Sequence, residues 1–81
     1  MMKVRVIVSF KKSVLDPQGQ TVKNALHSLG YTFVTDVRQG KVFEIEVEGL
    51  TSQEVHQKIP EIADKVLANP IIESFEWEIL D

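Results

Sequence analysis

The stretch Lys3–Gly19, KVRVIVSFKKSVLDPQG, decides how the rest of the chain is interpreted. Its first half alternates apolar and polar side chains, which predicts a β-strand over Lys3–Phe10. Its second half ends on Asp16-Pro17, a pair that favours a helix start, with Asp as the N-cap and Pro as the first helical residue. Every later element is expected to pack on this strand or to pair with it. The inward side chains of the strand are Val4, Val6, Val8 and Phe10.

The composition is that of a small globular protein. The 81 residues form one expected domain, 1–81, and a chain this short often gains stability by oligomerisation. The absence of cysteine excludes disulfides, cysteine-based zinc sites and thiolate chemistry. No apolar run approaches the ~20 residues of a membrane helix and no signal-peptide pattern opens the chain, so we expect a cytoplasmic protein without membrane contact.

Two helices and three further strands are expected after the first strand. Gln39-Gly40 is the turn signal of a tight hairpin. Pro60 interrupts the second helix without breaking its apolar phase, so one kinked helix is expected. The first expected helix runs from Asp16 to about Leu29, with the apolar stripe Val22, Ala25, Leu26 and Leu29, and Gly30 suits the left-handed position after it. The second expected helix runs from Thr51 to Asn69, and Thr51 with Glu54 has the pattern of a capping box. The expected strands are one from Phe33 or Val34 to Arg38, with Phe33 and Val37 inward, one at Lys41–Glu48 and one at Ile71–Leu80.

The order β-α-β-β-α-β predicts an α+β protein with a ferredoxin-like two-layer sandwich. This fold has a four-stranded antiparallel sheet in the order 4-1-3-2, with both helices on one face. It explains a charge asymmetry, because residues 1–41 hold seven basic and two acidic side chains and residues 42–81 hold two basic and ten acidic. Lys3 and Arg5 of the central strand would lie opposite glutamates of both neighbours. These glutamates are Glu46, Glu48, Glu76 and Glu78.

The other end of the outer sheet face is apolar. The strand alternation places Ile7, Val42 and Ile72 there, with only serines between them. A contiguous apolar patch on a surface indicates a contact site. We therefore expect another subunit to bury Ile7, Val42 and Ile72.

The sequence offers no constellation typical of catalysis or nucleic-acid binding. His27 and His56 have no metal-ligating partner at i+3 or i+4 and are expected to be solvent-facing helix residues. Ser9 and Ser13 lack the context of a nucleophile, and no phosphate-binding glycine loop is present. Glutamates at the outward strand positions would repel phosphate, which argues against RNA recognition.

Four segments carry a resemblance to a known family. They resemble PurS, the small subunit of formylglycinamidine ribonucleotide (FGAM) synthase, and the similarity spans essentially the whole chain. Pro60 departs from what we expect of the second helix in this family. The four segments are Lys3–Gly19 with Val14–Gly19 at its centre, Ala25–Gly30, Asp36–Lys41 and Leu67–Glu73.

The resemblance implies a subunit that is not catalytic by itself. In this family's complex a glutaminase subunit releases ammonia and a large synthetase subunit uses ATP and Mg²⁺, as a step of de novo purine synthesis. The small subunit bridges the two and is thought to assist ammonia transfer. The resemblance therefore implies no cofactor on this chain, a homo-oligomer (dimer or tetramer), and two larger protein partners.

Two questions stay open at the level of sequence. The candidate partner-contact residues also have a purely structural explanation as helix start, hairpin turn and helix end. Arg38 is the favoured contact, because a guanidinium beside a tight turn can bind a carboxylate or carbonyl with two hydrogen bonds. The alternative function is a stand-alone dimeric regulatory module that binds a small metabolite. The candidate contacts are Asp16, Pro17, Gln18, Gly19, Arg38, Gly40, Lys41 and Asn69.

Overall fold

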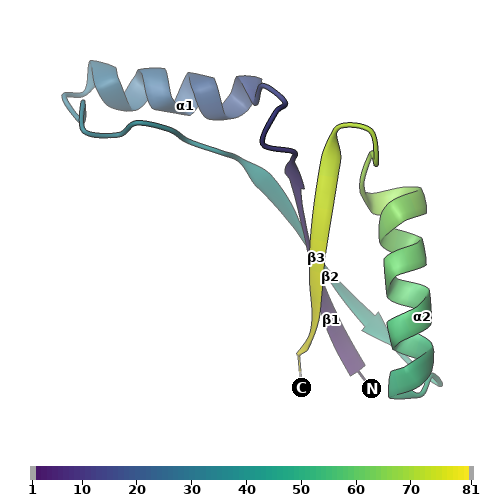
Figure 1. Ribbon diagram of the computed structural model, residues 1–81. Helices are drawn as coiled ribbons and strands as arrows, with labels where there is room; N and C mark the ends of the chain where they lie inside the picture. The colour runs from purple at the N-terminus through teal and green to yellow at the C-terminus, as the bar shows by residue number, and fades with distance from the viewer. Residues whose placement is uncertain (1, 81) are drawn as a thin grey trace.

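Strand β1 (Met2–Phe10) is the centre of the sheet in the computed structural model, which describes residues 2–80 (Figure 1). It pairs antiparallel with β2 (Gly40–Val47) on one side and with β3 (Glu73–Leu80) on the other. The inward side chains of β1 belong to the core, because Val4, Val6 and Val8 are at most 1% exposed. The prediction of a central first strand with this inward set is confirmed, apart from Phe10, which is half-buried.

Helix α2 (Ser52–Ile62) covers one face of this sheet. Its start is fixed by a capping box in which the Thr51 hydroxyl accepts from the Glu54 amide and the Glu54 carboxylate accepts from the Thr51 amide. Val55 and Ile59 are buried against β1, together with Ala63 of the following turn. Apolar side chains spaced at helical intervals thus provide the second layer of the core.

The helix continues through Pro60, as expected, and then widens. Residues Ala63–Leu67 form a π-helical turn, η1, in which the Ala68 amide donates to the Ala63 carbonyl at 2.8 Å. Proline has no amide to donate and its ring crowds the carbonyl one turn before it, so the helix around Pro60 is weakened. The widened turn, which the sequence pattern did not predict, follows this weak point.

Helix α1 (Pro17–Ser28) lies beyond one end of the sheet and does not cover its face (Figure 1). Gly30 follows the C-cap residue Leu29, and its φ of 96° suits the predicted left-handed position. The chain then runs back along α1 as an extended segment, 31–39, and passes directly into β2. We call residues 11–39, which include α1 and this segment, the arm.

The predicted four-stranded sheet in the order 4-1-3-2 is wrong. Within residues 2–80 the sheet has three strands in the order β2-β1-β3, α2 is the one helix on its face, and the segment from Phe33 to Arg38 is not a strand. Gln39-Gly40 forms no hairpin, because Gly40 lacks the positive φ that such turns require and begins β2 instead. The segment expected as strand two contacts α1 within the arm and does not pair with the sheet.

The chain is consequently elongated. Its extents are 51 × 27 × 14 Å and its radius of gyration is 16.2 Å, against about 12 Å expected for a compact chain of this length. The apolar stripe expected to pack on the sheet remains largely in solvent, with Val22 40% and Leu29 73% exposed. Phe33, expected to point inward, is 78% exposed.

The predicted pairing of basic and acidic side chains on the outer face of the sheet is present in part. Arg5 lies between Glu44, at 3.1 Å, and Glu78, at 3.6 Å, and Lys3 lies opposite Glu46 in the strand register. The expectation is confirmed for Arg5, which has a glutamate on each neighbouring strand, and only in part for Lys3, which lies opposite Leu80 on β3. It is wrong for Glu48, which follows the end of β2, and for Glu76, which lies opposite Ile7, and it missed Glu44.

Candidate functional site

Asp16 joins the two sides of the arm at its root. Its side chain, only 4% exposed, accepts from the Gly19 amide at 2.9 Å and from the Gln39 amide at 2.6 Å. The first bond caps α1, and the second ties the returning segment to the helix start. These two backbone donors, Gln39 foremost, lower the pKa of the Asp16 carboxyl below its ordinary value.

Gly19 allows the helix and the returning segment to touch. A Cβ atom at this position would lie 2.2 Å from the Val37 carbonyl oxygen and 3.0 Å from the Asp16 carboxylate. No other residue type fits such an approach without moving the backbone. Gly19 and Asp16 together therefore fix the geometry of the arm root.

Arg38 uses its guanidinium inside the chain. It donates to the Val14 carbonyl at 2.6 Å and to the Lys12 carbonyl at 3.2 Å, and it lies 3.6 Å from the Asp36 carboxylate. These bonds attach the loop after β1 to the returning segment. The Arg38 guanidinium thus binds two carbonyl oxygens within the arm, and the predicted contact with a partner stays a prediction.

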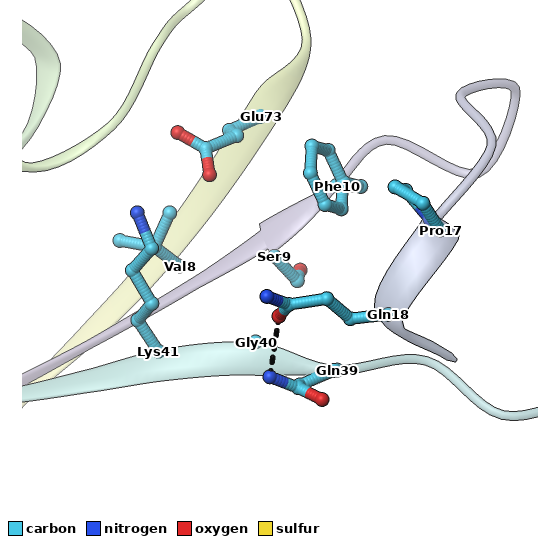
Figure 2. Close-up of a pocket in the computed structure, with 9 residues that line it drawn as sticks. All are labelled: Val8, Ser9, Phe10, Pro17, Gln18, Gln39, Gly40, Lys41 and Glu73. Atoms are coloured by element: carbon cyan, nitrogen blue, oxygen red, sulfur yellow. Dashed lines mark hydrogen bonds between the residues drawn. The ribbon is translucent and has the colours of Figure 1, made fainter. Parts of the chain in front are cut away.

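A cavity of about 290 Å³ lies between the arm root and the end of the sheet. Figure 2 shows Gln18 of α1 next to Gln39, with the Gln39 side-chain amide donating to the Gln18 side-chain oxygen. Lys41 of β2 and Glu73 of β3 contribute charged groups to the same cavity. The cavity is lined by Val8, Ser9, Phe10, Pro17, Gln18, Gln39, Gly40, Lys41 and Glu73.

The structure therefore brings most of the predicted contact residues together. Asn69 lies outside the cavity, in the turn before β3, where its amide donates to the Glu73 carboxylate at 2.7 Å. Glu73 itself was missed by the sequence analysis. The available signal was strand alternation, which places this acid on the inward side with Phe75 and Trp77.

The predicted apolar patch is partly assembled. Ile7 and Val42 are directly opposite each other in the register of β1 and β2, and they are 41% and 60% exposed. Ile72 is 36% exposed but precedes β3, in a turn whose carbonyl accepts from the Lys11 amide. Burial of this patch by another subunit stays a prediction.

The two histidines are bonded to carbonyl oxygens. A ring nitrogen of His27 lies 2.7 Å from the Val34 carbonyl, and one of His56 lies 2.8 Å from the Ser52 carbonyl. His56 is exposed as expected, and His27 is half-buried between α1 and the returning segment.

Among residues 2–80 no group of three or more His, Asp or Glu side chains is arranged to hold a metal ion. None of the helices in this range has the length and apolarity needed to cross a bilayer.

The fold and the arm root define a class of protein: a small α+β chain that presents a projecting arm and exposed apolar surface. Residues 3–81 match the PurS family, which is described as phosphoribosylformylglycinamidine (FGAM) synthase. The chain therefore belongs to the PurS family of FGAM synthase subunits, and the resemblance seen in the sequence is confirmed.

Relatives from several organisms support this assignment. The PurS subunit of Bacillus subtilis is 46% identical to this chain, over 98% of this chain and 93% of its own length. A crystal structure of B. subtilis PurS matches with a TM-score of 0.90 at 44% identity, and the match covers both chains fully. The structure of Methanocaldococcus jannaschii PurS, described as a subunit of an amidotransferase in the purine biosynthetic pathway, matches with a TM-score of 0.87 at 36% identity, covering 100% of this chain and 98% of that one. A structure of PurLQS from Thermotoga maritima contains a chain that matches with a TM-score of 0.86 at 26% identity, covering 98% of this chain and 96% of that one.

Proposed function

We propose that the chain is a non-catalytic bridging subunit of FGAM synthase in the cytoplasm. It links a glutaminase subunit to an ATP-dependent synthetase subunit and assists the transfer of ammonia between them. The observation that carries this proposal is the match to a chain of the PurLQS structure over 98% of this chain. In this proposal the chain itself binds no cofactor, and ATP and Mg²⁺ are used by the synthetase.

Ammonia transfer gives a bridging subunit a physical purpose. Ammonia released into water is diluted and protonated, so it must pass between two sites that are held together and shielded from solvent. A bridge acts through surfaces, and this chain has two: the arm root around Asp16 and Gln39, and the outer face around Ile7 and Val42. We assign these two surfaces to the contacts with partner subunits and with further copies of the chain, in a dimer or tetramer.

Turnover of the synthetase with two nitrogen sources tests this proposal. Glutaminase and synthetase subunits are assayed with glutamine or with ammonium salt, in the presence and absence of this protein. The bridge predicts that the protein restores glutamine-dependent turnover and leaves ammonia-dependent turnover nearly unchanged. An equal effect on both nitrogen sources, or on neither, rejects a role in coupling.

The cavity at the arm root keeps the metabolite-binding module as a second candidate. Its volume of about 290 Å³ lies at the lower end of the range found for small-molecule sites. A ligand that binds only the folded state raises the melting temperature with its concentration. Screening glutamine, purine nucleotides and pathway intermediates by thermal shift separates this candidate from the bridge, which requires no such ligand.

A further inference from the structure

We propose that the cavity at the arm root binds a free α-amino acid with a carboxamide side chain. The proposal names a ligand class for the metabolite-binding module, the second candidate function, and rests on that candidate. It does not depend on the bridging role. The cavity has a volume of about 290 Å³, and its walls combine two opposite charges, a pair of amides and apolar side chains.

The two charged groups of the cavity are available to a ligand. Lys41 of β2 supplies a positive charge and Glu73 of β3 a negative one, and among residues 2–80 neither takes part in an ion pair. Glu73 accepts from the Asn69 amide at 2.7 Å with one oxygen, and its other oxygen meets no donor in this part of the chain. Each charge can therefore bind a ligand group of the opposite sign.

The equal and opposite charges of the cavity favour a zwitterion over other ligands. A phosphate group carries more than one negative charge, which Lys41 alone would not balance and which Glu73 would repel. An apolar ligand would take both charges out of water and give neither a partner. An α-amino acid pairs its carboxylate with Lys41 and its ammonium group with Glu73.

The amides of Gln18 and Gln39 provide recognition of a ligand side chain. The Gln39 side-chain amide donates to the Gln18 side-chain oxygen, so the pair keeps one NH₂ group and one carbonyl oxygen for other partners. A carboxamide has the complementary acceptor and donor and can bind both. In Figure 2 this pair lies on one side of the view and the charged groups of Lys41 and Glu73 lie on the other. The zwitterion and the side chain of one amino acid can thus be bound at once.

The remaining walls of the cavity suit the methylene groups of such a ligand. They include the apolar side chains of Val8, Phe10 and Pro17. The volume of the cavity lies at the lower end of the range for small-molecule sites, which favours a ligand of amino-acid size. Size, charge and hydrogen-bonding groups therefore agree on the same class of ligand.

Calorimetric titration of the whole chain with L-glutamine and L-asparagine provides the first test. We expect a dissociation constant of about 1 mM or lower for at least one of them. Butyramide has the amide without the charges and should not bind. L-leucine has the charges without the amide and should bind about 10-fold more weakly or less. The proposal is overturned if neither amide amino acid binds, if butyramide binds equally well, or if adenosine monophosphate binds more tightly.

Charge-removing variants provide the second test. Lys41→Met removes the positive charge, and Glu73→Gln removes the negative one while keeping an oxygen for the Asn69 amide. Each should raise the dissociation constant of the tighter amino acid about 10-fold or more. Lys58→Met and Glu76→Gln are the matched controls, because both residues are exposed and lie outside the cavity, and they should leave it unchanged. Wild-type affinity in both cavity variants overturns the proposal.

NMR spectroscopy locates the ligand without any substitution. When the amino acid is added to the labelled chain, the side-chain NH₂ signals of Gln18 and Gln39 should shift. Those of Gln20 and Gln57, which lie outside the cavity, should stay in place. Shifts confined to residues outside the cavity overturn the proposal.

The amino-acid site and the proposed functions fail in distinguishable ways. If glutamine-dependent turnover is restored and no amino acid binds, the site is rejected and the bridge stands. If an amino acid binds at the cavity and turnover is not restored, the bridge is rejected and the site stands. If thermal shift finds only a ligand of another class, the metabolite-binding module stands without the amino acid.

Discussion

Asp16 shows how one side chain can decide the shape of a chain. As an N-cap it is an ordinary helix signal, but in this structure its second oxygen also binds the Gln39 amide, 23 residues further on. That second bond holds segment 34–39 beside α1. A residue that the sequence marks as a local helix start therefore acts as a long-range tether.

We predict that Asp16→Asn lowers the melting temperature by about 5 °C, because an amide offers one acceptor oxygen where the carboxylate uses two. The native pKa of Asp16 is lowered, so the folded protein binds fewer protons here than the unfolded chain. Wild-type stability should fall as pH decreases through the ordinary value of 3.8, and the fall is complete below the native pKa. Thermal melts of both proteins between neutral and acid pH measure this. Equal pH profiles would count against the tether.

Gly19→Ala should destabilise the protein more than a typical surface substitution. The new methyl group would lie 2.2 Å from the Val37 carbonyl, so helix and segment must separate, at a cost of about 2 kcal/mol or more. Gln20→Ala, at an exposed neighbouring position of α1, is the control and should change stability by less than about 0.5 kcal/mol. Urea unfolding followed by circular dichroism measures both. Similar unfolding midpoints for the two variants would mean that the arm root is not tightly packed.

At the scale of elements, the start of α2 supplies a prediction independent of the arm. Thr51→Ala removes the hydroxyl that accepts from the Glu54 amide and should cost about 1 kcal/mol of stability. The bonds from Thr51 also lower the pKa of Glu54, so the variant should show a Glu54 pKa closer to its ordinary value. Ser52→Ala, one residue later and outside the cap, is the control. NMR titration and urea unfolding measure the two effects, and a Thr51→Ala unfolding midpoint equal to that of the wild type would contradict the capping assignment.

Elements that depend on local signals were predictable from the sequence. Alternation identified β1 and its buried valines, Asp16-Pro17 and Gly30 bounded α1, and Thr51 with Glu54 marked the start of α2.

The three-stranded sheet was not predictable in this way. Segment 34–39 has a partly apolar sequence that is compatible with a fourth strand and equally with an extended segment beside α1. The local sequence pattern therefore does not distinguish the two structures. The choice depends on the hydrogen bond that the Gln39 amide donates to the Asp16 carboxylate and on the close approach of Gly19 to the Val37 carbonyl. Both are contacts between residues far apart in sequence.

The candidate site was predictable to a similar degree. Pro17, Gln18, Gly40 and Lys41, which were selected as partner contacts, line one cavity, and their contact with a partner stays a prediction. Glu73 was missed because it belongs to no turn or cap motif. Gln39 was missed because only the glycine of the Gln39-Gly40 turn signal was selected as a contact. Their position at the cavity follows from the strand register and from the path of the arm, and both are properties of the assembled molecule.

At the scale of the whole molecule, the arm explains the elongated shape and the exposed apolar surface together. A basic, apolar arm projects from an acidic body that keeps part of its own sheet face uncovered. Such a chain gains stability from assembly, which agrees with membership of a family of enzyme subunits. The central claim of this account is that the arm lies away from its own sheet.

A distance measured within one chain tests this claim most directly. Spin labels are attached to Leu29→Cys at the arm tip and Glu48→Cys just after β2, and the labelled chain is diluted in unlabelled wild type. The account predicts an electron–electron distance of more than half the 51 Å length of the molecule. In a compact chain with α1 folded back over its own sheet, the end of α1 would lie near the end of β2, at roughly 10–20 Å. A dominant distance in that short range would contradict the account.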